Sequence, residues 1–173
     1  TVMGGEAVVS CDSPVAPTDQ YRHNMSCKQN IAEAKKLLKE AGYPNGIEMV
    51  IHVSTKEPTW PTIAEVIQQQ VAKAGIKVDI KMTPSKSYWK ETWMKKDVAM
   101  TRWNERSADS VLHEVYHSSA KWNESYYKSS DFDKNLADAR GELDFKKRKA
   151  LYEKAQHTLC LLYTSDAADE HRR

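Results

Sequence analysis

The passage from residue 47 to residue 103 alternates between strand-like and helix-like patterns, and this alternation constrains the fold more than any other feature. Residues 76–82 alternate strictly between apolar and polar side chains, which predicts a strand with one buried face. Before them, apolar residues keep helical spacing from Pro61, which suits a first helical position, to Gly75. Further patterns predict strands at 47–53 and 97–103 and a short helix at 85–95. The order strand, helix, strand, helix, strand predicts a βαβαβ lobe of the α/β class with a largely parallel sheet.

Helical patterns lie on both sides of this lobe. Asn30 is a good N-cap with Glu33 three residues later, a capping-box pattern, and the apolar stripe that follows ends at Gly42. After Trp103 the patterns are helical only, with expected helices at 109–117, around 132–139, and from a cap at Asp144 to about 159. A compact α/β lobe followed by helices indicates that the chain leaves one lobe for another.

Composition narrows the function classes. Hydrophobic residues make up 40% and charged residues 29%, which is typical of a globular protein. The net charge is +2, and basic residues are interleaved with acidic ones, so we expect no nucleic-acid partner. The chain does not begin with Met, and we expect its opening to come from the interior of a longer protein.

The end of the chain breaks the preceding amphipathic pattern. Residues 160–173 look like the translation of a transposon-type sequencing adapter, and we expect them to be a non-native tail. On this expectation the chain keeps two cysteines, Cys11 and Cys27, for structural reasoning.

Four segments in order carry a resemblance to a known family. They are AEAKKLLKEAGYPNG (32–46), IAEVIQQQVAKAGIKVDIKM (63–82), TRWNERSADSVL with YHSSAKWNES (101–125), and LDFKKRKALYEKAQ (143–156). Together they make residues 14–159 resemble the extracellular solute-binding proteins of ABC importers, family 5, the dipeptide, oligopeptide and nickel group.

The resemblance implies a type II periplasmic-binding-protein-like fold with two lobes that close around a hinge. It implies an irregular inter-lobe connection at 1–28, an α/β ligand-binding lobe at 29–103, and a helical return toward the first lobe at 104–159. It further implies a monomeric, periplasmic or cell-surface protein that uses no cofactor and catalyses nothing. Its partners would be a small solute, peptide-like or opine-like, and the permease subunits of an ABC importer.

The resemblance also points to candidate ligand-binding residues: Trp103, Asn104 and Arg106. Residues 103–109 follow the third predicted strand, and ligands of open α/β sheets bind beyond the carboxyl ends of strands. In peptide-binding relatives an Asp stands at the position of Arg106 and pairs with the peptide amino group. Because Arg106 reverses that charge, it would favour an anionic solute group. Two alternatives stay open: Arg106 can form a salt bridge to Glu105, Asp109 or the opposite lobe, and Trp103 can stack on the solute or pack at the hinge.

One motif suggests a different class of protein. His113, Glu114 and His117 fit the H-E-x-x-H pattern, in which two histidines one helical turn apart bind Zn²⁺ and the glutamate acts as general base. The alternative function is therefore a zinc-dependent hydrolase. The extended form of the motif fails, because Ala120 and Asn123 occupy the places of its glycine and third histidine.

Cys11 and Cys27 offer a possible disulfide. In an exported protein the pair would close a loop of about 16 residues and contribute about 3 kcal/mol in the chain-entropy model. Two unpaired thiols in a loop are the equally weighted alternative.

Overall fold

The computed structural model describes residue 5 and residues 7–25 and 27–165, with side chains up to residue 160. The described chain divides into two compact units. Lys28–Trp103 forms the bulk of unit 1, whereas unit 2 contains Val8–Cys27 and the chain from Asn104 onward. Residues 166–173, most of the expected non-native tail, lie outside the described residues.

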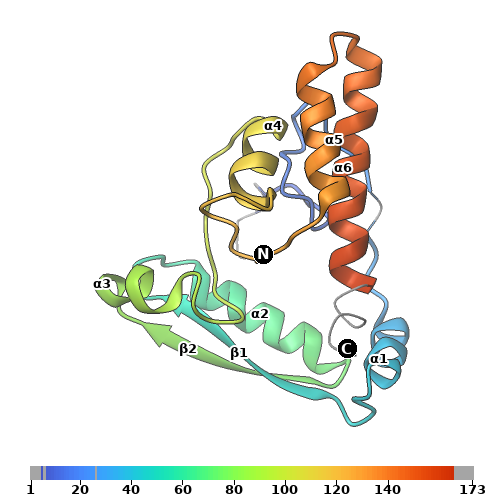
Figure 1. Cartoon of the computed structure of the whole chain (residues 1–173). Helices are drawn as coiled ribbons and strands as arrows, with labels where there is room; N and C mark the ends of the chain where they lie inside the picture. Colours follow the sequence, from blue (N-terminus) through green and yellow to red (C-terminus); the bar gives the residue numbers. More distant parts are fainter. Residues whose placement is uncertain (1–4, 6, 26, 166–173) are drawn as a thin grey trace. The chain divides into compact units, whose positions relative to one another are not determined.

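Unit 1 is a βαβ arrangement preceded by a helix (Figure 1). Strands β1 (Ile47–Ser54) and β2 (Ile76–Thr83) are parallel and pair in register from Ile47 opposite Ile76 to Ser54 opposite Thr83. Helix α2 (Trp60–Ala72) makes the crossover between them, with Pro61 in its first turn as predicted. Three shorter elements complete the unit: α1 (Ile31–Glu40), α3 (Ser85–Ser87) and the π-helical turn η1 (Tyr88–Thr92).

The core of unit 1 lies between α2 and the sheet. Its buried members are Ile51, Val53, Trp60, Ala64, Val78 and Tyr88. The Tyr88 hydroxyl lies 2.6 Å from the carbonyl oxygen of Met100 and 3.1 Å from that of His52. A buried hydroxyl thus joins η1 to both chain segments on which it packs. Helix α1 begins as predicted, because the Asn30 side chain accepts a hydrogen bond from the Glu33 amide.

The prediction of a third strand at 97–103 is wrong in extent. The sheet of the described chain has two strands, and the third segment reaches it through one bridge, between Ala99 and His52. The His52 amide donates to Val98, and the Met100 amide donates back to His52. The segment just before this bridge is still turning, since the amides of Lys95 and Lys96 both donate to Thr92. The segment therefore becomes extended only near Ala99, and it pairs with β1 through a single bridge.

Unit 2 is helical. It contains α4 (Ala108–Val111), the π-helical turn η2 (Leu112–Tyr116), α5 (Ser130–Gly141) and α6 (Phe145–Ser165). Figure 1 shows α5 and α6 side by side as a hairpin. The helix predicted at 109–117 exists, but it widens from α to π geometry after Val111. Among the described residues no helix has the length and apolar character needed to cross a bilayer.

The side chains that face one another in unit 2 form its core. Phe132, Leu136 and Ala139, the predicted stripe of α5, are all buried. They share this core with buried residues of the other elements: Val15, Ala108, Leu112, Val115, Tyr152, Ala155 and Leu159.

The segment 8–27 is held on α6 by a buried amide. The Gln156 side chain is fully buried; its nitrogen donates to the carbonyl of Tyr21 at 2.7 Å, and its oxygen accepts from the His23 amide at 3.0 Å. Cys11 and Cys27 are joined by a disulfide, with 5.3 Å between their Cα atoms. The described residues of the segment 8–27 are thus an anchored part of unit 2.

Candidate functional site

Unit 2 contains a polar depression where two loops meet. Its volume is about 430 Å³. One loop contributes Ala16, Thr18 and Asp19, and the other contributes Glu105, Arg106 and Ser107. The second loop is the one in which the sequence placed its candidate ligand residues.

Hydrogen bonds from the first loop fix the second. The Asp19 carboxylate accepts from the Ala108 amide at 2.8 Å and from the Tyr21 amide at 2.7 Å. The Thr18 hydroxyl donates to the Glu105 carboxylate at 3.1 Å. Ser107 caps α4 by accepting from the Ser110 amide. Asp19 therefore satisfies a backbone N–H at the start of α4, and the two loops form one structured surface.

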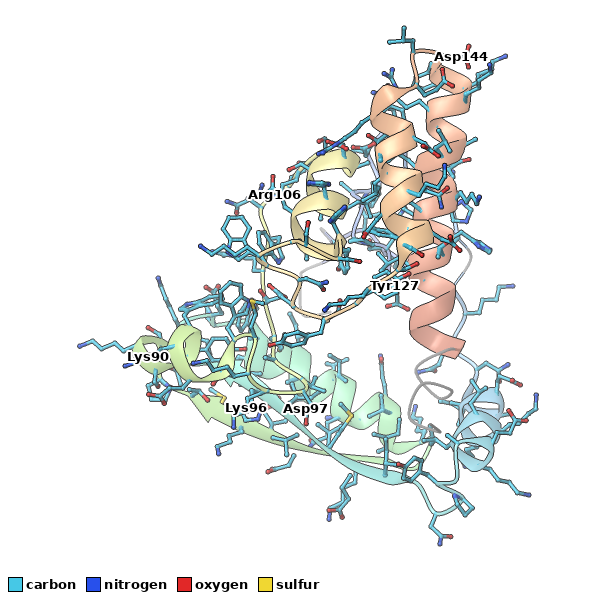
Figure 2. The ribbon with its side chains drawn as sticks, viewed as in Figure 1. Lys90, Lys96, Asp97, Arg106, Tyr127 and Asp144 are labelled. Carbon is cyan, nitrogen blue, oxygen red and sulfur yellow. A yellow bond between two sulfur atoms is a disulfide. The ribbon has the colours of Figure 1, made fainter. Side chains whose placement is uncertain are left out.

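Arg106 forms a salt bridge with Glu114, a residue that the sequence analysis did not name as its partner. Its guanidinium donates to the Glu114 carboxylate at 2.5 Å and lies 3.4 Å from the Ser110 hydroxyl. Glu114 lies eight residues further on, in the helical stretch from Ala108 to Tyr116, whose turns bring its carboxylate within reach of Arg106. Figure 2 shows Arg106 beside α4.

The charges around the depression are mainly negative. Asp19 and Glu105 each bring a carboxylate to the lining, and the positive charge of Arg106 is balanced by Glu114. Glu105 is exposed, so its carboxylate is accessible from solution. The arrangement therefore favours a positively charged group over an anion.

A second ion pair, between Asp109 of α4 and Arg140 of α5, holds α4 against the long helices of the unit. The Arg140 guanidinium of α5 binds both oxygens of Asp109, at 2.7 and 2.9 Å, and the Tyr152 hydroxyl of α6 donates to the same carboxylate at 3.0 Å. The hydrogen bond from Arg140 holds the pKa of Asp109 below its ordinary value, against the opposing effect of burial. Burial, followed by the hydrogen bond to Asp109, raises the pKa of Tyr152. Asp109 thus connects the short helix α4 to both long helices of the unit.

The three predicted ligand residues fall in different units. Trp103 is half-buried and is the last residue of unit 1, whereas Asn104 and Arg106 belong to unit 2, with Asn104 exposed. The sequence pointed to the loop at 104–107 but missed Thr18 and Asp19, the residues that hold it. Pro17-Thr18-Asp19 is a recognisable turn signature, yet nothing in a single sequence shows which distant loop such a turn contacts.

The three residues of the H-E-x-x-H motif are engaged in other interactions. Glu114 binds Arg106 and Ser110. The His113 ring nitrogen Nε2 lies 3.5 Å from the Arg140 guanidinium, while burial lowers the pKa of His113, assisted by the charges of Arg140 and His117.

His117 faces Ser119 with one ring nitrogen, and its other ring nitrogen lies 3.7 Å from Asp133. Throughout the described residues no cluster of three or more His, Cys, Asp or Glu side chains has the geometry to hold a metal ion. A guanidinium next to one of the two histidines would also repel a metal cation.

Comparison with known proteins identifies the family. A sequence profile of the bacterial extracellular solute-binding proteins, family 5 (middle part), matches residues 1–123. The chain belongs to this family. Among the curated family 5 relatives, the glutathione-binding protein GsiB of Pectobacterium atrosepticum is 30% identical over 137 residues, which are 72% of this chain and 27% of that protein. The chain therefore spans about a quarter of the length of the curated relatives it matches.

Solved structures of solute-binding proteins share the fold. The periplasmic binding protein DppA from Helicobacter pylori, in complex with the peptide STSA, is 33% identical with a TM-score of 0.74, over 90% of this chain and 31% of that one. MoaA from A. tumefaciens R10, in complex with mannopinic acid, is 28% identical with a TM-score of 0.62, over 78% and 28%. These matches confirm the resemblance drawn from the sequence and the α/β, type II binding-protein fold.

Proposed function

We propose that this chain is part of the solute-capturing component of an ABC importer, which acts at the bacterial cell surface or in the periplasm. Membership of family 5 supports this proposal, as does the polar depression formed by the loop at 104–107. The relatives named above bind a peptide, glutathione and mannopinic acid, which are small polar solutes. On this proposal the solute is of the same kind, hinge closure around it produces the form that the permease subunits accept, and the captured solute leaves chemically unchanged.

We further propose that the depression receives a positively charged group of the solute, such as a free amino group. The observation that carries this proposal is the pairing of Arg106 with Glu114, because Glu105 and Asp19 then remain as carboxylates of the lining for which the described side chains provide no basic partner. Asp19 is engaged by backbone amides, so Glu105 is the more accessible of the two charges. The proposal reverses the sequence-based expectation of an anionic solute, which assumed that the Arg106 charge faces the solute. Glu105, held by Thr18, would be the contact residue, and Asn104 next to it would add a polar contact. Trp103 is the last residue of unit 1, and its contact with the solute stays a prediction from the sequence.

Catalysis by zinc is not part of the proposal. The motif His113-Glu114-x-x-His117 would need Glu114 as a free general base, and its carboxylate is bound by Arg106 and Ser110.

The proposal is tested by isothermal titration of the chain with trialanine and with N-acetyl-trialanine. Because the chain spans about a quarter of its relatives' length, we expect weak binding of trialanine, with a Kd of about 1 mM. Loss of the amino charge in the acetylated peptide should weaken binding about tenfold, as should Glu105→Gln.

Glu65→Gln, the same substitution at an exposed position of α2, serves as the matched control and should leave the affinity unchanged. Equal affinity for the two peptides would refute the preference for a positively charged group. An unchanged affinity for trialanine in the Glu105→Gln variant would refute it as well.

A further inference from the structure

The connection between α5 and α6 projects an apolar side chain into solvent. Leu143 is 91% exposed, the highest value among the large hydrophobic side chains that the structure describes. Phe145, the first residue of α6, is 44% exposed and rests with one side against Tyr21. Figure 2 marks the position by Asp144, which lies between them at the end of the helical hairpin.

Four consecutive basic residues follow this apolar tip. Lys146 and Lys147 are exposed, and the structure assigns them no acidic partner among the described side chains. Arg148 packs its guanidinium over the Tyr21 ring at 5.6 Å, and Lys149 lies 4.0 Å from Glu153. The accessible positive charge therefore comes mainly from Lys146 and Lys147.

The two acidic residues of the tip are turned toward the backbone. The Asp144 carboxylate accepts from the Lys147 amide at 2.9 Å, and the Glu142 carboxylate accepts from the Asp144 amide at 2.8 Å. Both carboxylates thus lie at the positive end of the α6 dipole, which offsets their charge. The groups that the end of the hairpin presents to solvent are therefore the Leu143 side chain and the ammonium groups of Lys146 and Lys147.

We propose that this hairpin tip, defined as residues 142–147, is a contact surface for an anionic lipid membrane. Leu143 inserts among the acyl chains near the headgroups, and Lys146 and Lys147 bind the phosphates. An interface of this kind needs an apolar side chain with basic residues next to it, and it needs no matched shape in the partner. The charge complementarity comes from the lysines.

A lipid surface suits the tip better than a protein partner does. Specific protein interfaces bury about 800 Å² on each side, more than residues 142–147 alone present. A membrane can accept a single inserted side chain. This part of the argument rests on the proposed function, in which the permease subunits hold the protein near the membrane, so that several weak contacts are enough.

The test is co-sedimentation of the full chain with vesicles of pure phosphatidylcholine and with vesicles containing phosphatidylglycerol at low salt. We expect binding to the anionic vesicles only, and weaker binding as salt is raised. Lys146→Gln with Lys147→Gln should lower the partition coefficient by about fivefold per lysine. Leu143→Ser should lower it about tenfold, and circular dichroism checks that each variant is folded.

Matched controls come from α1, which also carries a half-exposed leucine and exposed lysines. Leu37→Ser and the double variant Lys35→Gln with Lys39→Gln should leave vesicle binding unchanged. Equal binding to neutral vesicles, no binding to anionic ones, or equal losses in the α1 controls would overturn the proposal. Unchanged vesicle binding in the tip variants, together with loss of their association with permease protein, would assign the tip to a protein surface instead and would equally overturn the proposal.

Discussion

Two glycines of unit 1 share a left-handed backbone and differ in their surroundings. Gly42 has φ of +89° and Gly46 has φ of +86°. A Cβ on Gly42 would meet nothing within 4 Å, whereas a Cβ on Gly46 would lie 1.9 Å from the carbonyl oxygen of Gly75. That carbonyl accepts the Ile47 amide, the first hydrogen bond between β1 and the end of the crossover. Glycine at position 46 therefore meets two requirements: the left-handed backbone of the turn, and the close contact with the backbone of Gly75 where β1 begins.

We predict that Gly46→Ala destabilises the chain by about 3 kcal/mol or more, because it adds a backbone clash to the strain of a left-handed alanine. Gly42→Ala carries the strain alone and should cost about 1 kcal/mol. Urea denaturation followed by circular dichroism measures both. Similar losses in the two variants would show that the contact with Gly75 does not matter.

Single residues also show what the sequence can and cannot reveal. The cap at Asn30, Pro61 in the first turn of α2 and the buried stripe Phe132, Leu136 and Ala139 follow from local patterns, and the structure confirms them. The pairing of Arg106 with Glu114 was not predictable from the sequence. Glu105 and Asp109 are nearer along the chain, and the helix that begins at Ala108 brings the Glu114 carboxylate to the guanidinium.

Helix α4 is held in place by its neighbours in unit 2. It has four residues, too few to be stable alone, and its hold on α5 and α6 passes through Asp109. The loop at 104–107 leads directly into α4, so the contacts of Asp109 hold the helix that follows this loop.

This contact gives unit 2 an acid-sensitive contribution to stability. The pKa of Asp109 is lowered from its ordinary value of 3.8, mainly by the hydrogen bond from Arg140. A carboxyl group with a depressed pKa in the folded state contributes fully above its unfolded pKa, and the contribution is lost as the pH falls through the folded value.

We predict that Asp109→Asn lowers the free energy of unfolding by about 1–2 kcal/mol at pH 7, allowing for the partial exposure of the pair. The difference from the unmodified chain should begin to shrink below about pH 4, the unfolded pKa, and should shrink further as the pH falls through the lower folded-state pKa. Asp138→Asn, at an exposed pair with Lys134 on α5, is the control and should change stability by less than about 0.5 kcal/mol. A deficit in Asp109→Asn that is the same at pH 7 and pH 2 would contradict the ionic role of Asp109.

Helices and strands were predicted well where a local sequence pattern repeats along the element. They were predicted poorly where the length of the element depends on pairing with another segment. Both full strands and their parallel order followed from residues 47–83, since alternation and a crossover helix are local features. The third strand was predicted at residues 97–103 from the local pattern. The length of a strand also depends on its partners, and after the turn at Thr92–Lys96 one bridge forms. The π-helical widening after Val111 has no signal in the sequence pattern.

In the molecule as a whole, the chain combines one α/β unit and one helical unit, and the change of unit falls between Trp103 and Asn104. The family followed from four segments spread over the chain, because family likeness accumulates over many positions. The candidate site did not follow in the same way. It joins residues 16–19 to residues 105–107, and this pairing, supported by the disulfide and by Gln156, exists only in the folded unit.

The claim at the centre of this account is that the depression between these two loops receives a positively charged group. Its most direct test is a two-dimensional ¹⁵N–¹H NMR titration of the chain with trialanine and, separately, with succinate. The account predicts saturable shifts of the amides of Thr18, Asp19 and Glu105–Ala108 with trialanine, and none with succinate. Shifts of these amides with succinate, or trialanine shifts confined to other parts of the chain, would contradict it.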